Sequence, residues 1–178
     1  MWESIELIYK DILNQWSNCW KEAVIAGFLL MTVGRQISHI FNKHKSPFIL
    51  LFADGVFLYY LLYVTLLMRS IGSRREIGLF PFIGEELLNG DFHYLIENML
   101  LFIPFGVLLY VNLHTYGRGC SIRMVLLVSF LTSVSIELLQ YVFSCGKSEI
   151  DDVLANVIGA LIGYAISRSG KAALNMSS

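Results

Sequence analysis

Two long apolar segments separated by a short polar loop occupy residues 133–163, reading SVSIELLQYVFSCGKSEIDDVLANVIGALIG. A helix crosses a bilayer with about 20 largely apolar residues, and each segment extends into a run of that length. Polar residues nevertheless border the loop on both sides: Glu137, Gln140, Asp151, Asp152 and Asn156. Ionisable groups inside membrane segments are costly and by default indicate a functional site. The pattern predicts a membrane protein with a polar centre.

The composition supports this class for the whole chain. Of its 178 residues 56% are hydrophobic and 15% are charged, whereas soluble domains are about 45–50% apolar and about 25% charged. No basic patch with interleaved aromatic residues occurs, which argues against nucleic acid as a partner. We therefore expect an all-α, polytopic helical bundle in a single domain, residues 1–178. About five spans are predicted, at residues 23–41, 48–68, 92–113, 124–143 and 150–167.

Residues 1–20 form a separate amphipathic pattern ahead of the first predicted span. Trp2, Ile5, Tyr9, Trp16 and Trp20 recur at helical spacing, with charged and amide residues on the other face. Such a helix lies in the membrane interface. The same pattern also fits a helix that packs on the other helices.

The loop charges predict the orientation of the spans. Lysine and arginine divide evenly between the two sides, but every loop carboxylate lies on the side of the N-terminus. The loops on the other side are purely basic, and basic loops are typical of the cytoplasmic side. We expect the N-terminus outside the cell and the C-terminus in the cytoplasm.

This orientation places polar residues of three spans at one depth. Asn98, Glu137 and Gln140 fall near the outer ends of their spans, and Asp151, Asp152 and Asn156 begin the last one. All lie on the side of the long connection 69–91, which predicts a single extracytoplasmic site. Two structural roles remain open: a carboxylate at 151 or 152 also caps a helix start, and Glu137 also suits an ion pair with Arg74, Arg75 or Lys147.

The residue types of this centre allow more than one ligand chemistry. Carboxylates bind Mg²⁺ or Ca²⁺ through oxygen, and carboxylates with nearby cations also bind an amine or phosphate of a lipid head group. The residues do not choose between these, so metal and cofactor stay unassigned. Ala155, Gly159 and Gly163 recur at four-residue steps, which predicts a close approach to another helix.

Three blocks in the second half of the chain carry a family resemblance. They are SRREIGLFPFIG (73–84), ENMLLFIPFGVLL (97–109) and SIELLQ (135–140), the last followed by Asp151, Asp152, Asn156 and Gly159. By their order and spacing the chain resembles the VanZ-like family of bacterial membrane proteins over about residues 69–167. The family commonly has Gly-Arg before the aspartates, where this chain has Gly146-Lys147. Lysine keeps the charge but lacks the planar bidentate fork of arginine.

The resemblance implies a location in the bacterial cytoplasmic membrane and a role in the cell envelope. The founding member of the family is associated with resistance to teicoplanin, a lipoglycopeptide that attacks cell-wall precursors. The resemblance therefore implies reduced teicoplanin susceptibility through an outer-leaflet site that binds the antibiotic or a membrane lipid. In that site Glu137, Asp151 and Asp152 supply negative charge, Asn98, Gln140 and Asn156 form hydrogen bonds, and Arg74, Arg75 and Lys147 meet acidic groups.

Catalysis is the alternative interpretation of the same residues. In an enzyme acting on a lipid or cell-wall precursor, Glu137 or Asp152 would serve as general acid or base. The sequence does not decide whether the protein is an enzyme.

Overall fold

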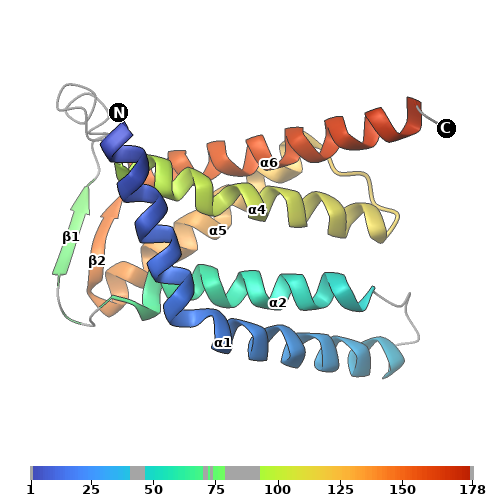
Figure 1. Cartoon of the computed structure of the whole chain (residues 1–178), viewed down its shortest axis with the longest axis horizontal. Helices are drawn as coiled ribbons and strands as arrows, with labels where there is room; N and C mark the ends of the chain where they lie inside the picture. Colours follow the sequence, from blue (N-terminus) through green and yellow to red (C-terminus); the bar gives the residue numbers. More distant parts are fainter. Residues whose placement is uncertain (1, 41–46, 70–71, 73, 79–92, 177–178) are drawn as a thin grey trace. The chain divides into compact units, whose positions relative to one another are not determined.

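Long apolar runs without internal breakers account for most of the secondary structure. The computed structural model describes residues 2–40, 47–69, 72, 74–78 and 93–176 (Figure 1). These residues contain α1 (Trp2–Ile40), α2 (Phe48–Leu62) continued by the π-helix η1 (Tyr63–Leu67), α4 (His93–Thr115), α5 (Ile122–Phe143) and α6 (Ile150–Met176). They also contain two short strands, β1 (Arg74–Gly78) and β2 (Cys145–Glu149). The predicted all-α fold is confirmed, with one short strand pair that the sequence did not predict.

Four helical segments are long and apolar enough to cross a membrane. They are Phe48–Leu67, His93–Thr115, Ile122–Phe143 and Ile150–Gly170, each of 20 to 23 residues. A span needs about 20 residues as a helix. The chain is thus a multi-pass membrane protein, and four of the five predicted spans are matched.

The remaining predicted span, at residues 23–41, falls in α1. This helix joins the expected interfacial segment and the expected first span without a break, because neither glycine nor proline occurs before Gly27. The helix changes direction partway along its length (Figure 1). Its side chains beyond Gln36 lie outside the described part of the structure, so the first span and the interfacial position remain predictions.

The first of two compact units comprises Met1–Met68 and Thr115–Arg118. Within it α1 packs along α2, and glycines permit the close approach. A Cβ atom added at Gly55 of α2 would lie 2.8 Å from the carbonyl oxygen of Ala26 and 2.8 Å from the Cα atom of Gly27. The rings of Phe28 and Phe52 meet edge-on beside this contact, with centroids 5.1 Å apart.

The second unit comprises Arg69–His114 and Gly119–Ser178, and therefore holds α4, α5, α6 and both strands. Glycines again bring two helices into backbone contact. A Cβ at Gly106 of α4 would collide with the carbonyl oxygen of Ala160, and Cβ atoms at Gly159 and Gly163 of α6 would collide with those of Met99 and Ile103. The predicted close approach of the small residues in α6 is confirmed, and the partner is α4.

The strands β1 and β2 pair in parallel within this second unit. Ser144, in the left-handed conformation with φ of 53°, ends α5, and Cys145 begins β2. The backbone N–H of Gly72 donates to the carbonyl of Phe143 at 3.3 Å and so ties the stretch before β1 to the end of α5. Residues 70, 71, 73 and 79–92, which include the rest of the predicted connection and of the first family block, lie outside the described residues. The prediction of one domain over 1–178 stays a prediction.

Candidate functional site

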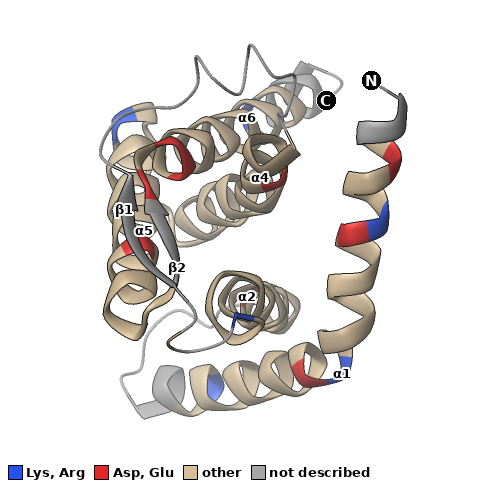
Figure 2. Cartoon of the chain, turned by 90° about the vertical axis from the view of Figure 1, so that its left-hand side faces the viewer, with Lys and Arg blue, Asp and Glu red and all other residues tan. Residues whose placement is uncertain are grey.

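The hairpin formed by α5, β2 and α6 carries buried polar side chains in two helices that can span a membrane. Glu137 and Gln140 of α5 are 7% and 2% exposed, and Asp151 and Asn156 of α6 are 5% and 3% exposed. Figure 2 shows acidic positions on α5 and α6 and at the end of β2. Burial at these four positions means that protein atoms, and not lipid, surround their side chains.

One hydrogen bond joins the two helices directly. The side-chain Nδ2 of Asn156 donates to the hydroxyl Oγ of Ser133 at 2.8 Å, and both residues are buried. The short connection through β2 makes α5 and α6 antiparallel neighbours (Figure 1). Because the helices are antiparallel, one turn along α5 from Ser133 to Glu137 covers the same direction as one turn back along α6 from Asn156 to Asp152. Ser133, Glu137, Asp152 and Asn156 thus form one polar seam between α5 and α6. Within it Glu137 and Asp152 lie one turn closer to β2, the tip of the hairpin.

The tip of the hairpin is tied to the carboxylate of Glu137. The backbone N–H of Glu149, the last residue of β2, donates to Glu137 Oε2 at 3.1 Å. The thiol of Cys145 lies 3.8 Å from the carbonyl oxygen of Gln140 and donates to it. These contacts fix the position of β2 against the last turns of α5. Sequence reasoning missed both, because a backbone amide leaves no signal in the residue types.

The strand pair brings the three predicted basic residues into one ladder. In the parallel register Arg74 lies opposite Cys145, Arg75 opposite Gly146 and Glu76 opposite Lys147. The backbone of all three basic residues is thus next to the end of α5, although their side chains lie outside the described part of the structure. The predicted ion pair of Glu137 with Arg74, Arg75 or Lys147 stays a prediction.

Asn98 reaches the same region from α4. The carbonyl of the next residue, Met99, lies against Gly159, which follows Asn156 by one turn in α6. Asn98 is half-buried. The backbone of α4 thus lies beside α6 one turn beyond Asn156, and the single site formed with Asn98 stays a prediction.

The buried amide of Asn156 has capacity to bind a further group. Among the described residues its Oδ1 atom is buried without a hydrogen-bond partner. An unsatisfied buried acceptor costs about 1–3 kcal/mol, so a donor or a cation at this atom is favoured. Carboxylate and amide oxygens are also the ligands that Mg²⁺ and Ca²⁺ take, and Glu137, Asp152 and Asn156 are the residues of the seam that offer them.

A known family of proteins matches this chain over the region in which these contacts lie. The sequence profile of the VanZ/LLP1 family matches residues 24–171. The chain is 34% identical over 93 residues to a protein of Enterococcus faecium called Protein VanZ. That alignment covers 52% of this chain and 53% of the relative, so the chain spans about half of the relative's length. No solved structure matches the chain. Because the profile covers the four helices that can cross a membrane together with the whole polar hairpin, the chain belongs to the VanZ/LLP1 family.

Proposed function

We propose that this membrane protein lowers the susceptibility of a bacterial cell to teicoplanin. Two observations support the proposal: membership of the VanZ/LLP1 family and the similarity to a relative whose name is Protein VanZ. The resemblance of the family blocks to those of a resistance-associated family points the same way. The proposed activity is one of the cell envelope, at the membrane in which the protein resides.

The polar seam of the α5–α6 hairpin is the proposed binding site. The observation that carries it is the burial of Glu137 and Asn156 inside helices that can span a membrane. Polar groups at such positions are expensive, and an unused buried amide oxygen adds to the cost. A ligand that supplies donors or positive charge would offset it.

The ligand is the antibiotic itself or a membrane lipid. Glu137, Asp151 and Asp152 would provide negative charge, while Asn98, Gln140 and Asn156 would form hydrogen bonds. Arg74, Arg75 and Lys147, whose backbones lie in or beside the strand pair, would meet acidic groups of the ligand. In the predicted orientation this site lies at the depth of the outer leaflet, where a lipoglycopeptide would arrive.

The test is antibiotic susceptibility of a sensitive Gram-positive host that expresses the chain. Minimum inhibitory concentrations of teicoplanin and vancomycin would be compared for the wild type, Glu137→Gln and Asp152→Asn at equal membrane levels. Glu6→Gln, on the exposed part of α1, is the matched control because it removes a carboxylate far along the chain from the hairpin. We expect the wild type and the control to protect against teicoplanin in preference to vancomycin, and the two hairpin variants to lose protection. A wild type without any protective effect would show that the proposal is wrong.

A further inference from the structure

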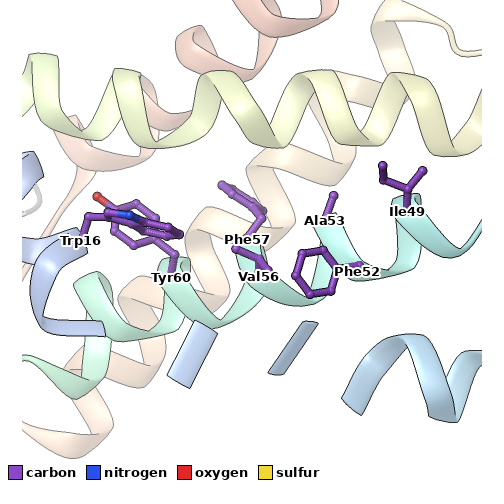
Figure 3. A pocket seen from close by; sticks show the side chains of 7 residues that line it. All are labelled: Trp16, Ile49, Phe52, Ala53, Val56, Phe57 and Tyr60. Atoms are coloured by element: carbon purple, nitrogen blue, oxygen red, sulfur yellow. The ribbon is translucent and has the colours of Figure 1, made fainter. Parts of the chain in front are cut away.

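An apolar groove lies in the first unit, and all of its lining residues come from α1 and α2. One face of α2 forms an apolar groove of about 430 Å³, which is within the range of about 300–1,000 Å³ of small-molecule sites. The groove follows a single stripe of the helix at intervals of three and four residues: Ile49, Phe52, Ala53, Val56, Phe57 and Tyr60. Trp16 of α1 completes the lining, and Figure 3 shows it beside Tyr60 at one end with Ile49 at the other.

The length of the stripe fits one leaflet of a bilayer. From Ile49 to Tyr60 the helix rises about 16 Å at about 1.5 Å per residue. The hydrocarbon core of a bilayer is about 30 Å thick, so the groove has the depth of about half the core. It starts at the first residues of α2, in a segment that can span the membrane. A single acyl chain of a phospholipid has this extent and this chemistry.

At the end of the groove away from Ile49, an aromatic contact and a hydrogen bond join α1 and α2. The rings of Trp16 and Tyr60 meet edge-on, with centroids 5.6 Å apart. The hydroxyl of Tyr60 donates to Oε1 of Gln15 at 3.3 Å. A chain lying along the whole groove would reach Trp16, so the fluorescence of this tryptophan would report on its presence.

A helix start and one basic side chain lie next to the Ile49 end of the groove. Pro47 precedes α2 without a side-chain cap, and the first turn of α2 holds no acidic residue. The free amides and the dipole of a helix start attract anions. At the same end the guanidinium carbon of Arg35 lies 5.1 Å from the ring centroid of Phe48.

We infer that this groove holds one acyl chain of an anionic phospholipid, with the phosphate at the start of α2 near Arg35. The charge at the open end selects the head group, and the stripe from Ile49 to Tyr60 accepts the chain. The cytoplasmic leaflet, where the predicted topology places this end, attracts basic segments through its anionic lipids. The protein would therefore carry a bound phosphatidylglycerol-like lipid that is separate from any ligand of the α5–α6 hairpin.

Quenching of Trp16 fluorescence by brominated lipids tests this inference. The full chain with Trp2→Phe and Trp20→Phe keeps Trp16 as its only tryptophan. It would be reconstituted in phosphatidylcholine vesicles that contain increasing fractions of phosphatidylglycerol or phosphatidylcholine brominated in the distal half of one acyl chain. We expect brominated phosphatidylglycerol to reach half-maximal quenching at a severalfold lower mole fraction than brominated phosphatidylcholine. Arg35→Gln should reduce this preference by about fivefold, which corresponds to about 1 kcal/mol for one basic residue near a membrane surface.

Two further variants separate the groove from the general lipid surface. Ala53→Phe fills the groove, whereas Leu58→Phe adds a ring to a position of α2 that is 49% exposed and outside the groove. We expect Ala53→Phe to abolish the preference and Leu58→Phe to leave it unchanged. Equal quenching by both lipids in the wild type, or a preference that survives both Ala53→Phe and Arg35→Gln, would overturn the inference. Absence of quenching by either lipid would also overturn it, because the groove would then be closed by another part of the protein.

Discussion

Asn156 of α6 donates a hydrogen bond of 2.8 Å from its side-chain amide to the hydroxyl of Ser133 in α5, and both side chains are buried. Helices in a membrane have little hydrophobic reason to choose one neighbour over another, since lipid tails are as apolar as leucine. A polar pair between two helices therefore contributes to the choice of partner and to the register. In this hairpin the pair also aligns Glu137 with Asp152.

The Ser133–Asn156 pair should show a measurable coupling energy. We expect Ser133→Ala and Asn156→Ala to destabilise the fold, and the double variant to be less destabilised than the sum by about 0.6 kcal/mol, up to about 1.7 kcal/mol. The measurement is the free energy of unfolding in mixed detergent micelles for the four proteins of the cycle. Additive effects would mean that the hydrogen bond does not join the helices.

The contact between α4 and α6 should tolerate no side chain at its glycines. Gly159→Ala and Gly163→Ala each place a Cβ atom into a backbone carbonyl of α4, and overpacking of this kind costs about 1–3 kcal/mol. Gly170→Ala is the matched control in α6, because nothing lies within 4 Å of its Cβ position. There the higher helix propensity of alanine should leave stability unchanged or raise it by up to about 1 kcal/mol. Thermal unfolding in detergent distinguishes the two outcomes, and equal effects at all three positions would contradict the packing.

Glu137 should have a structural role that is separable from its charge. Glutamine at this position keeps an oxygen that accepts the N–H of Glu149, whereas alanine removes the acceptor. We expect Glu137→Ala to lose about 1–3 kcal/mol more stability than Glu137→Gln. The free energy of unfolding and the teicoplanin susceptibility would be measured for both variants. If Glu137→Gln keeps its stability but loses protection, the missing charge accounts for the loss. Equal stability of the two variants would argue against the bond to Glu149.

The thiol of Cys120, in the connection between α4 and α5, should react slowly at neutral pH. Burial raises its pKa above the ordinary range, so at a given pH less of it is thiolate than in an unfolded chain. Alkylation of a variant that keeps only this cysteine should be slower than that of the denatured protein at pH 8. The difference should shrink as the pH approaches the raised pKa. A ratio of rates that does not change with pH would assign the protection to steric access instead.

The same single-cysteine protein tests the predicted orientation. Cys120 lies in a connection predicted to be cytoplasmic, so an impermeant maleimide should label it only after the cells are permeabilised. Lys10→Cys, at an exposed position of α1 and in a variant without the three native cysteines, should be labelled in intact cells because the N-terminus is predicted to be outside. Reversed labelling of the two positions would invert the topology and move the hairpin site to the inner leaflet.

Local patterns determined the helical part of the fold. Four apolar runs of about 20 residues were recognisable as spans because in a bilayer the backbone must satisfy its own hydrogen bonds, and a single helix does so without a partner. Glu137 and Asn156 are conspicuous in the sequence alone, since polar residues in such runs are rare. The small residues at 159 and 163 likewise predicted a close helix contact, although not with which helix.

Only the tertiary structure decided which of these elements meet. The pairing of Arg74 with Cys145, the bond from Glu149 to Glu137 and the contact of Gly159 with Met99 each join residues whose partner is not signalled by their neighbours in sequence. Backbone amides and carbonyls carry most of these contacts, and every residue type offers the same backbone groups. The sequence by itself therefore determined that the protein is a multi-pass helical membrane protein and which polar residues lie within its spans. Their arrangement into one seam, beside a parallel strand pair, depends on packing between segments far apart in the chain.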